Sequence, residues 1–274
     1  MIRLFCFLVA ILIPLKAHGE ELPIFDAHIH YSHDAVTLVP PDEAVKALRK
    51  AGVRKALVSS SDDNGTQLLL AAAPDVIVPS LRPYRRRGEI STWMHDPSVI
   101  DYVETNLARN TYFAIGEFHA YGDDIKTPVI QRIIALAKEH NLLLHAHSDA
   151  KAIDLIFETY PDALVLWAHS GFDRPEEVQQ VLARHDNLWA DLAFRSDQSS
   201  GGKVTEDWLP VFKAYPDRFM VGTDTFAPER WYYVEDHANF SREWISTLPA
   251  ELIERIAYRN AEDMISRVEK RKSK

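Results

Sequence analysis

The sequence has almost no cysteine, since Cys6 is the only one in 274 residues. Cys6 lies in an apolar run, Leu4 to Leu15, that follows Arg3 and leads to the small residues of Ala17-His18-Gly19. This pattern predicts a secretory signal peptide over residues 1–19, cleaved before Glu20, because the run is too short to span a bilayer. The mature chain would then contain no disulfide. We expect an exported protein, located in a bacterial periplasm.

Positive charge is also scarce. Lys and Arg number 31 against 40 Asp and Glu, which gives a formal net charge of −9 at pH 7. This balance argues against broad electrostatic attraction to nucleic acid or to an anionic membrane. Internal repeats, Gly/Ser linkers and low-complexity stretches are absent as well, so we expect one domain over residues 20–274. The hydrophobic share of 46% is enough for a sizeable core.

Apolar runs typical of strands alternate with amphipathic helical segments along the mature chain. The expected strands cover residues 24–30, 53–58, 76–80, 112–117, 141–147, 163–169, 188–192 and 218–223. The expected helices cover residues 41–50, 66–73, 97–109, 128–140, 150–160, 175–185, 208–214 and 248–267. We expect residues 31–41 to form a loop and residues 269–274 a charged tail. Eight strand–helix units in about 250 residues predict an α/β fold, a single (β/α)8 TIM barrel.

The first expected strand ends in a His-x-His pair. Because side chains alternate along a strand, Asp26, His28 and His30 point to the same side. Two neighbouring imidazoles can bind one metal ion through neutral ring nitrogens. The competing interpretation is a hydrogen-bonded histidine pair in the core.

Later strands end in further metal-binding side chains. Each of these follows an apolar run, and together they are Glu117, His145, His147, His169 and Asp224. They fall at the ends of the fourth, fifth, sixth and eighth strands, which in a barrel of this kind meet at one mouth. The sequence therefore predicts a metal site there. His140 and His185 instead end helices, where a cation complements the helix dipole, and we interpret them as structural.

These motifs, in this order, resemble those of the amidohydrolase superfamily of metal-dependent barrel hydrolases, and its amidohydrolase-related branch in particular. The resemblance covers nearly the whole mature chain. It is carried by Phe25-Asp26-Ala27-His28-Ile29-His30, Trp167-Ala168-His169-Ser170-Gly171, Val221-Gly222-Thr223-Asp224 and Arg259-Asn260-Ala261-Glu262. The segment Ala114-Ile115-Gly116-Glu117 is similar to the fourth strand of TatD-like hydrolases.

The resemblance implies a ligand set. His28, His30 and Asp224 would bind the more buried metal, and His145 and His169 would be further ligands. Only one of His145 and His147 need bind, and His145 is favoured because its apolar run places it first at the mouth. The fourth strand lacks the carbamylated lysine of some members, so Glu117 would either bridge two metals or support a single one. Zinc is the first expectation, with manganese or iron as alternatives.

The chemistry that follows is hydrolysis. A divalent metal lowers the pKa of its water towards 7, and Asp224 would be the general base that takes the proton. The metal or His169 would polarise the scissile carbonyl of an amide, ester or lactone. Asp224 and His169 are thus the predicted catalytic residues.

The substrate is expected to be a small molecule, anionic in our hypothesis. Arg82, Tyr84 and Arg195 follow the third and seventh strands and are the predicted substrate-binding residues, because arginine can hold a carboxylate or phosphate through paired hydrogen bonds. The run Arg85-Arg86-Arg87 is interpreted as a solvated turn. The aromatic residues Tyr31, Trp93, Trp231 and Tyr232 either form an apolar rim or pack loops.

Three other functions stay open at this point. A non-oxidative decarboxylase would use the same metal site, because the branch resembles the aminocarboxymuconate semialdehyde decarboxylase group. Phosphodiester chemistry, by analogy with TatD-like proteins, is disfavoured by the acidic charge. An exported, non-catalytic metal- or ligand-binding barrel is disfavoured because it would not need Asp224.

Overall fold

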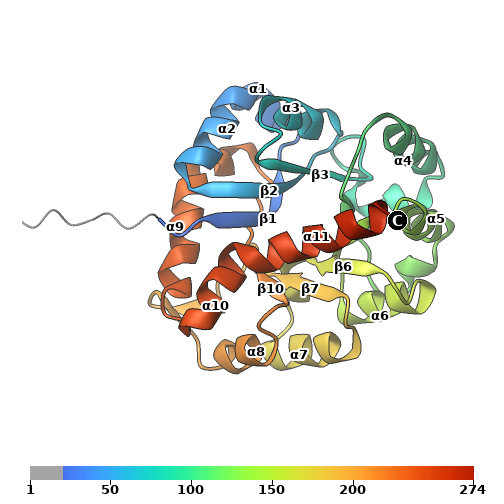
Figure 1. Cartoon of the computed structure of the whole chain (residues 1–274). Coiled ribbons are helices and arrows are strands. Elements are labelled where there is room, and N and C mark those ends of the chain that lie inside the picture. The colour runs from blue at the N-terminus through green and yellow to red at the C-terminus, as the bar shows by residue number, and fades with distance from the viewer. Residues whose placement is uncertain (1–20) are drawn as a thin grey trace, which may run out of the picture.

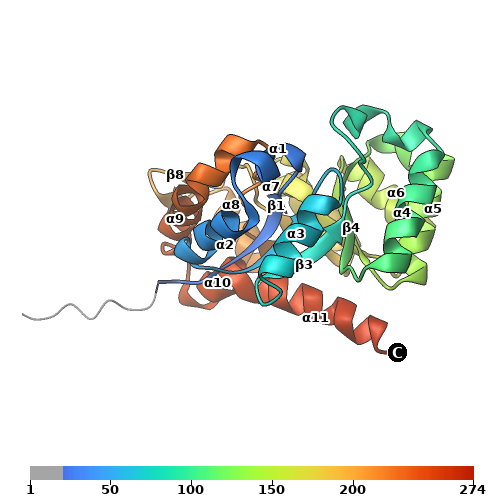
Figure 2. The ribbon, with the colours of Figure 1, turned by 90° about the horizontal axis from the view of Figure 1, so that it is seen from above.

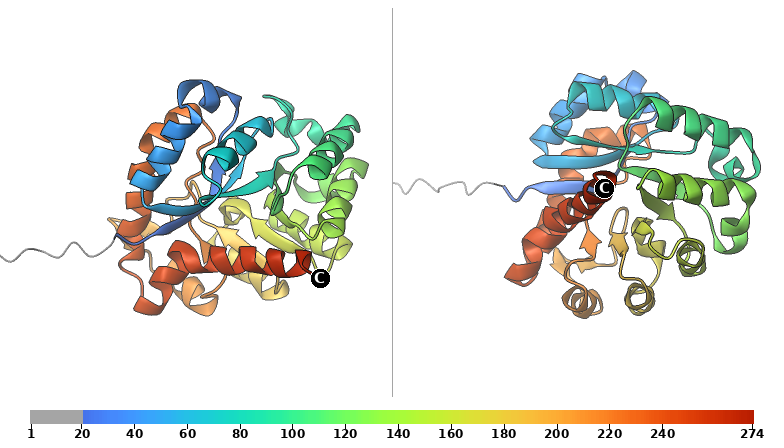
Figure 3. Two further views of the ribbon diagram at one scale, coloured as in Figure 1. Left: turned by 45° about the horizontal axis from the view of Figure 1, so that its top comes forward. Right: turned by 45° about the vertical axis from the view of Figure 1, so that its right-hand side comes forward.

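The computed structural model describes residues 21–274, so the predicted signal peptide lies outside the described residues. Eight parallel strands follow one another in a single sheet in the order β1-β2-β3-β4-β5-β6-β7-β10. They are β1 Ile24–His30, β2 Val53–Ser59, β3 Ile77–Leu81, β4 Ala114–His119, β5 Leu143–His147, β6 Leu164–Trp167, β7 Leu188–Asp191 and β10 Phe219–Met220. Figure 3 shows helices on the outside of this ring of strands. The predicted (β/α)8 TIM barrel is confirmed.

The helices lie between successive strands and after the last one (Figure 1). They are α1 His33–Leu38, α2 Pro41–Lys50, α3 Asn64–Ala72, α4 Ser98–Arg109, α5 Pro128–Glu139, α6 Ala150–Thr159, α7 Pro175–Arg184, α8 Trp208–Ala214, α9 Val234–Ile245, α10 Ala250–Glu254 and α11 Asn260–Lys272. A two-stranded hairpin, β8 Ser199–Ser200 and β9 Lys203–Val204, interrupts the segment between β7 and α8. None of the helices in residues 21–274 combines the length and the apolar character that crossing a bilayer requires.

Two backbone hydrogen bonds connect the first and last strands of the barrel. Ala27 N donates to Val221 O at 3.0 Å, and Asp224 N donates to His28 O at 2.7 Å. The second bond ties the end of β1 to the segment after β10, so His28 and Asp224 are positioned together. Closure of the barrel therefore also assembles part of the predicted site.

Two predicted segments were wrong. Residues 31–41 were expected to form a loop but contain α1, which buries Ala35, while the Tyr31 hydroxyl donates to Val39 O. The expected charged tail, residues 269–274, mostly belongs to α11, because Val268 is buried and Lys272 Nζ donates to Tyr112 O at 2.6 Å. Tertiary packing thus extends helix into segments whose composition alone favours a loop or a tail.

α11 covers the end of the barrel where the strands begin. Besides the Lys272 bond just before β4, Arg271 donates to Asp162 O just before β6. In Figure 2, α11 and α1 lie at opposite sides of the molecule. A cavity of about 530 Å³ lies beside α11, lined in part by Phe25, Ile77 and Ile265, and its lining includes no histidine. The metal-binding side chains are at the other end.

Asn260, in the motif Arg259-Asn260-Ala261-Glu262, has a structural role. Its side chain is fully buried, and its Nδ2 donates to Phe219 O at 2.8 Å and to Pro216 O at 3.0 Å. These bonds fix β10 to the start of α11, directly after a π-helical turn at Arg255–Arg259. The motif therefore anchors the short last strand, from which the chain continues to Asp224.

We expect Asn260→Ala to lower the free energy of unfolding by about 2 kcal/mol, because it leaves the buried carbonyl of Phe219 and the part-buried carbonyl of Pro216 without their donor. Denaturant unfolding followed by circular dichroism measures this. Asn106→Ala is the matched control, since its half-buried Nδ2 also donates to a carbonyl, Tyr102 O at 2.9 Å, but on the surface of α4. Equal losses in the two variants would contradict the proposed anchoring role of Asn260.

Candidate metal centre

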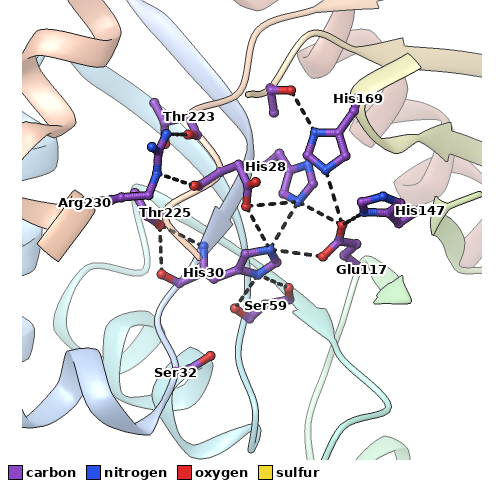
Figure 4. A network of polar contacts seen from close by, with 12 residues as sticks. His28, His30, Ser32, Ser59, Glu117, His147, His169, Thr223, Thr225 and Arg230 are labelled. Carbon is purple, nitrogen blue, oxygen red and sulfur yellow. Dashed lines mark hydrogen bonds and ion pairs between the residues drawn. The ribbon is translucent and has the colours of Figure 1, made fainter. Parts of the chain in front are cut away.

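Five of the predicted ligands gather at the ends of four strands, and Figure 4 shows that His28, His30, Glu117 and His169 point toward one another. His28 and His30 come from β1, Glu117 from β4, His169 from the turn after β6 and Asp224 from the segment after β10. All five are at most 6% exposed, so a charge placed among them is largely shielded from water.

The ligand atoms have the spacing of a coordination shell. His30 Nε2 lies 3.2 Å from His28 Nε2, 3.2 Å from Glu117 Oε2 and 3.4 Å from Asp224 Oδ1. His28 Nε2 lies 3.5 Å from Glu117 Oε1 and 3.8 Å from Asp224 Oδ1. His169 Nε2 lies 3.6 Å from Glu117 Oε1. Tetrahedral zinc with bonds of about 2.0–2.1 Å places its ligand atoms roughly 3.3 Å apart.

In each histidine ring, the hydrogen-bond partner of Nδ1 determines which nitrogen carries the proton. His28 Nδ1 contacts Asp191 Oδ2 at 3.2 Å, and His169 Nδ1 contacts Ala193 O at 2.7 Å. His30 Nδ1 contacts Ser59 O at 3.3 Å and Ser59 Oγ at 3.0 Å. Carboxylate and carbonyl oxygens only accept, so each neutral ring holds its proton on Nδ1 and presents a lone pair from Nε2.

These lone pairs face one another and two carboxylates, which is repulsive unless a cation lies between them. The residues present therefore fit a divalent metal ion, and the groups able to hold one include His28, His30 and Asp224, and His28, Glu117 and His169. Their mixed nitrogen and oxygen donors suit zinc, and also manganese or iron.

The pKa shifts at the site also indicate a cluster that attracts positive charge. Burial disfavours the charged form of Glu117, but His28 and its other histidine neighbours hold the pKa of that carboxyl well below its usual range. Burial also opposes charge on His28, but Asp191 and Glu117 raise the pKa of that ring well above its ordinary value. Without a metal, the acidic cluster attracts a proton to His28, and a bound metal ion would displace it.

Asp191 is a residue of this site that the sequence analysis missed. Its Oδ2 lies 3.2 Å from both His28 Nδ1 and His145 Nε2. Its Oδ1 accepts from the backbone N–H groups of His169, at 2.9 Å, and Ala193, at 3.0 Å. A signal was present, because Leu188-Trp189-Ala190-Asp191 is also an apolar run ending in a carboxylate. The expected strand was extended to residue 192, which hid that carboxylate inside it.

The two histidines of β5 lie in different layers. His147 Nδ1 contacts Glu117 Oε1 at 2.8 Å, and the His147 ring stacks on His119. His145 lies behind His28, with its Nε2 on Asp191. Of the two, it is thus His147, and not the favoured His145, that the structure brings to Glu117. His119, which no sequence argument singled out, completes a further group with Glu117 and His147.

Arg82 and Tyr84 support the site from its side. Arg82 Nη2 donates to Glu117 Oε2 at 2.7 Å, and Arg82 Nε donates to Glu117 O at 3.2 Å. The Tyr84 hydroxyl accepts from His119 N at 2.7 Å and lies 2.9 Å from His119 Nδ1. Both residues also line a cavity of about 630 Å³ at the mouth, together with Ser32, Ser61 and Thr225.

The structure does not bring Arg195 to that cavity. Four hydrogen bonds use its guanidinium, two to the Asp197 carboxylate and one each to His169 O and Asp173 O. An arginine has five N–H groups, so little remains for a substrate anion. Arg195 was predicted from its place after the seventh strand, but it instead holds the loop that carries His169.

Most of the aromatic residues considered for an apolar rim pack inside the protein. Tyr31, Trp93 and Trp231 are at most 2% exposed. Tyr232, the fourth predicted residue, is 65% exposed. Other large exposed rings are Phe172, which stacks on His169, and Phe226, which lines the cavity.

The backbone at the site is held in unusual conformations. His169, Ser170 and Asp224 have φ of 56°, 49° and 48°, in the left-handed region that non-glycine residues rarely adopt. Hydrogen bonds keep them there, including Ser170 Oγ to Asp191 O at 2.8 Å and Arg230 Nε to Asp224 O at 2.7 Å. Backbone held this way is typical of functional sites.

We expect His28→Ala/His30→Ala to lose the bound metal, because it removes two nitrogen ligands from the centre. Elemental analysis of the purified mature protein measures the metal content. His185→Ala is the control, since His185 Nε2 contacts Asp154 at 2.6 Å on the outside of the barrel. Metal retained in the double variant, or lost equally in the control, would contradict this site.

Comparisons with known proteins agree with the fold and the site. The amidohydrolase family model matches residues 108–267, more than half of the chain, while no curated protein matches the sequence.

Among solved structures, the chain is similar to an uncharacterised TIM-barrel protein from Bordetella bronchiseptica, with 13% identity, coverage of 90% of this chain and 100% of that one, and a TM-score of 0.59. It is similar to a candidate 2-pyrone-4,6-dicarboxylic acid hydrolase from Pseudomonas putida, with 14% identity, coverage of 90% and 98%, and a TM-score of 0.60. It is also similar to a TatD homologue from Escherichia coli, with 16% identity, coverage of 90% and 95%, and a TM-score of 0.54.

At these identities the structural likeness shows the shared barrel fold, and the family match supplies the chemistry. This chain belongs to the amidohydrolase family and is a metal-dependent hydrolase.

Proposed function

We propose that this protein hydrolyses an amide, ester or lactone bond in a small substrate, with Asp224 as general base and zinc as the metal. The observation that carries the proposal is the convergence of three Nε2 lone pairs, from His28, His30 and His169, on the carboxylates of Glu117 and Asp224. When bound, a divalent cation supplies Lewis acidity and lowers the pKa of the water it holds.

Asp224 is suited to move the proton. Its Oδ1 lies at the edge of the histidine cluster, 3.4 Å from His30 Nε2, and its backbone is fixed by bonds to His28 O and from Arg230. A carboxylate held there can accept the proton of the attacking water and return it to the leaving group. The fixed backbone keeps its oxygen aligned for both transfers.

His169 suits a ligand role better than a proton-donating one. Because its Nδ1 donates to Ala193 O at 2.7 Å, the neutral ring has no proton on Nε2 to offer a carbonyl oxygen. We therefore propose His169, with Glu117, as a metal ligand, and assign polarisation of the scissile carbonyl to the metal itself.

The cavity at the mouth is the proposed substrate site. Thr225, whose hydroxyl donates to His30 O, and Arg82, which contacts Glu117, line it, so it adjoins the ligand cluster. Arg82 and Arg86 supply positive charge and Phe226 an apolar wall. We propose a substrate with an anionic group and an apolar part, held with its scissile bond toward Asp224.

We expect Asp224→Asn to lower kcat on the best ester, lactone or amide of a screened panel by about 10²–10⁴-fold, because an amide cannot accept the proton. Asp217→Asn is the control. It removes the ion pair between Asp217 and Arg218 and should leave kcat unchanged. Undiminished kcat in Asp224→Asn would exclude it as the base. Release of carbon dioxide from a substrate, in place of a hydrolysis product, would favour the decarboxylase.

We also propose that residues 1–19 direct export to the periplasm. The support is the apolar run Leu4 to Leu15 before small residues. Expression of the full chain in a bacterial host should yield a periplasmic protein whose intact mass corresponds to a start at Glu20. Leu8→Arg, which interrupts the run, should keep the uncleaved chain in the cytoplasm. An uncleaved periplasmic product would contradict the proposed cleavage.

A further inference from the structure

The Glu117 carboxylate has more partners than one metal ligand needs. Oε2 lies 2.7 Å from Arg82 Nη2 and 3.2 Å from His30 Nε2. Oε1 lies 2.8 Å from His147 Nδ1 and 3.5 Å from His28 Nε2. A carboxylate offers about four lone-pair directions, two on each oxygen. Arg82 and His147 take one on each oxygen, and the remaining two face the same group of histidine nitrogens.

Buried charge in the centre balances with a single divalent cation. Glu117, Asp191 and Asp224 are buried carboxylates that carry three negative charges. Arg82, 8% exposed, contributes one positive charge, and one divalent cation contributes the other two. A second divalent cation would leave an excess of two positive charges in a site shielded from water, which is costly.

A fourth carboxylate, Asp26, does not change this balance. It accepts hydrogen bonds from His28 N, Thr223 N and the Thr223 hydroxyl. Arg230, bonded to the carbonyls of Thr223 and Asp224, supplies a matching positive charge beside it.

A further group of candidate ligands, Glu117, His119 and His147, differs from the groups around His28 because its ring nitrogens carry protons where the others present lone pairs. His147 Nδ1, 2.8 Å from the Glu117 carboxylate, must carry a proton to donate. The Tyr84 hydroxyl accepts from His119 N, so the arrangement that satisfies both groups directs the Tyr84 proton to His119 Nδ1. The neutral His119 ring then holds its own proton on Nε2. Neither this nitrogen nor His147 Nδ1, which faces Glu117, offers a lone pair to a metal.

We propose that this centre binds one divalent cation and that the Arg82 guanidinium takes the place of a second. Arg82 is a positioning residue: through its two bonds to Glu117 it fixes the direction in which the carboxylate faces the histidines, and it supplies a permanent positive charge on the other side. The inference rests on the proposed function, because it assumes that the first metal site is real.

The test is a titration of chelator-stripped mature protein with Co²⁺, followed by visible absorbance and by calorimetry. Wild type and Arg82→Lys, which keeps the charge, should saturate at one equivalent. Arg82→Met, which removes charge and donors together, should saturate at two. It frees one lone-pair direction on Glu117 and lowers the excess charge of a doubly loaded centre from two to one, so that a second ion can displace the proton of His147 Nδ1. Arg132→Met is the matched control and should stay at one, because Arg132 pairs with Glu104 and Glu139 on the surface.

Two equivalents in wild type, or one in folded Arg82→Met, would overturn the inference while leaving the proposed hydrolase in place. No Co²⁺ bound by wild type would overturn the proposed function, and the inference with it. Electron paramagnetic resonance of the Mn²⁺-loaded wild type gives an answer that does not depend on any variant folding. An isolated six-line spectrum supports one ion, and the signal of a spin-coupled pair contradicts it.

Discussion

The centre depends on the mutual repulsion of groups that barrel closure forces into one buried volume. Three Nε2 lone pairs and two carboxylates come into contacts of 3.2 to 3.8 Å, and their side chains are buried from water. Such a cluster is unfavourable unless positive charge enters it, either as a metal ion or as a proton on His28. Folding thus makes metal binding favourable. The strands bring the ligands together, and the bound ion relieves the repulsion between them.

Asp191 holds this arrangement in place. One of its oxygens orients the His28 and His145 rings, and the other binds the backbone N–H groups of His169 and Ala193. Its carbonyl accepts the Ser170 hydroxyl. Burial opposes ionisation of Asp191, but the neighbouring histidines, His28 foremost, hold the pKa of its carboxyl well below its usual value. A single ionised side chain therefore sets a ring tautomer on β1 and the left-handed turn after β6, which links the two halves of the barrel at the metal site.

The sequence predicted elements and site residues correctly where the evidence lay within a single strand or helix. The period of apolar residues located all eight strands and most helices, and the strand ends located His28, His30, Glu117, His169 and Asp224. It could not decide the partners of a side chain where those partners lie elsewhere in the chain. Arg195 and Arg82 both follow a strand of the barrel. Arg195, however, donates its hydrogen bonds to Asp197 and to His169 O, while Arg82 donates to Glu117. His145 and His147 share a strand face, and only the depth of each in the barrel separates their partners. Such pairings depend on three-dimensional register, which local pattern does not encode.

The unusual backbone conformations explain why the two ends of the barrel differ. In residues 21–274, six non-glycine residues have positive φ, and five of them, His169, Ser170, Phe172, Phe194 and Asp224, follow the strands at the mouth. Each costs free energy that the rest of the fold must supply. Hydrogen bonds at the mouth hold these residues, among them Ser170 Oγ to Asp191 O and Arg230 Nε to Asp224 O. At the opposite end, Asn260 and Lys272 of α11 bond to the carbonyls at the strand starts, where none of these five residues lies. It follows that the same loss of stability matters differently at each end. At the α11 end it lowers only the amount of folded protein, whereas at the mouth relief of strain can even raise stability while it displaces Asp224 and His169 from the metal.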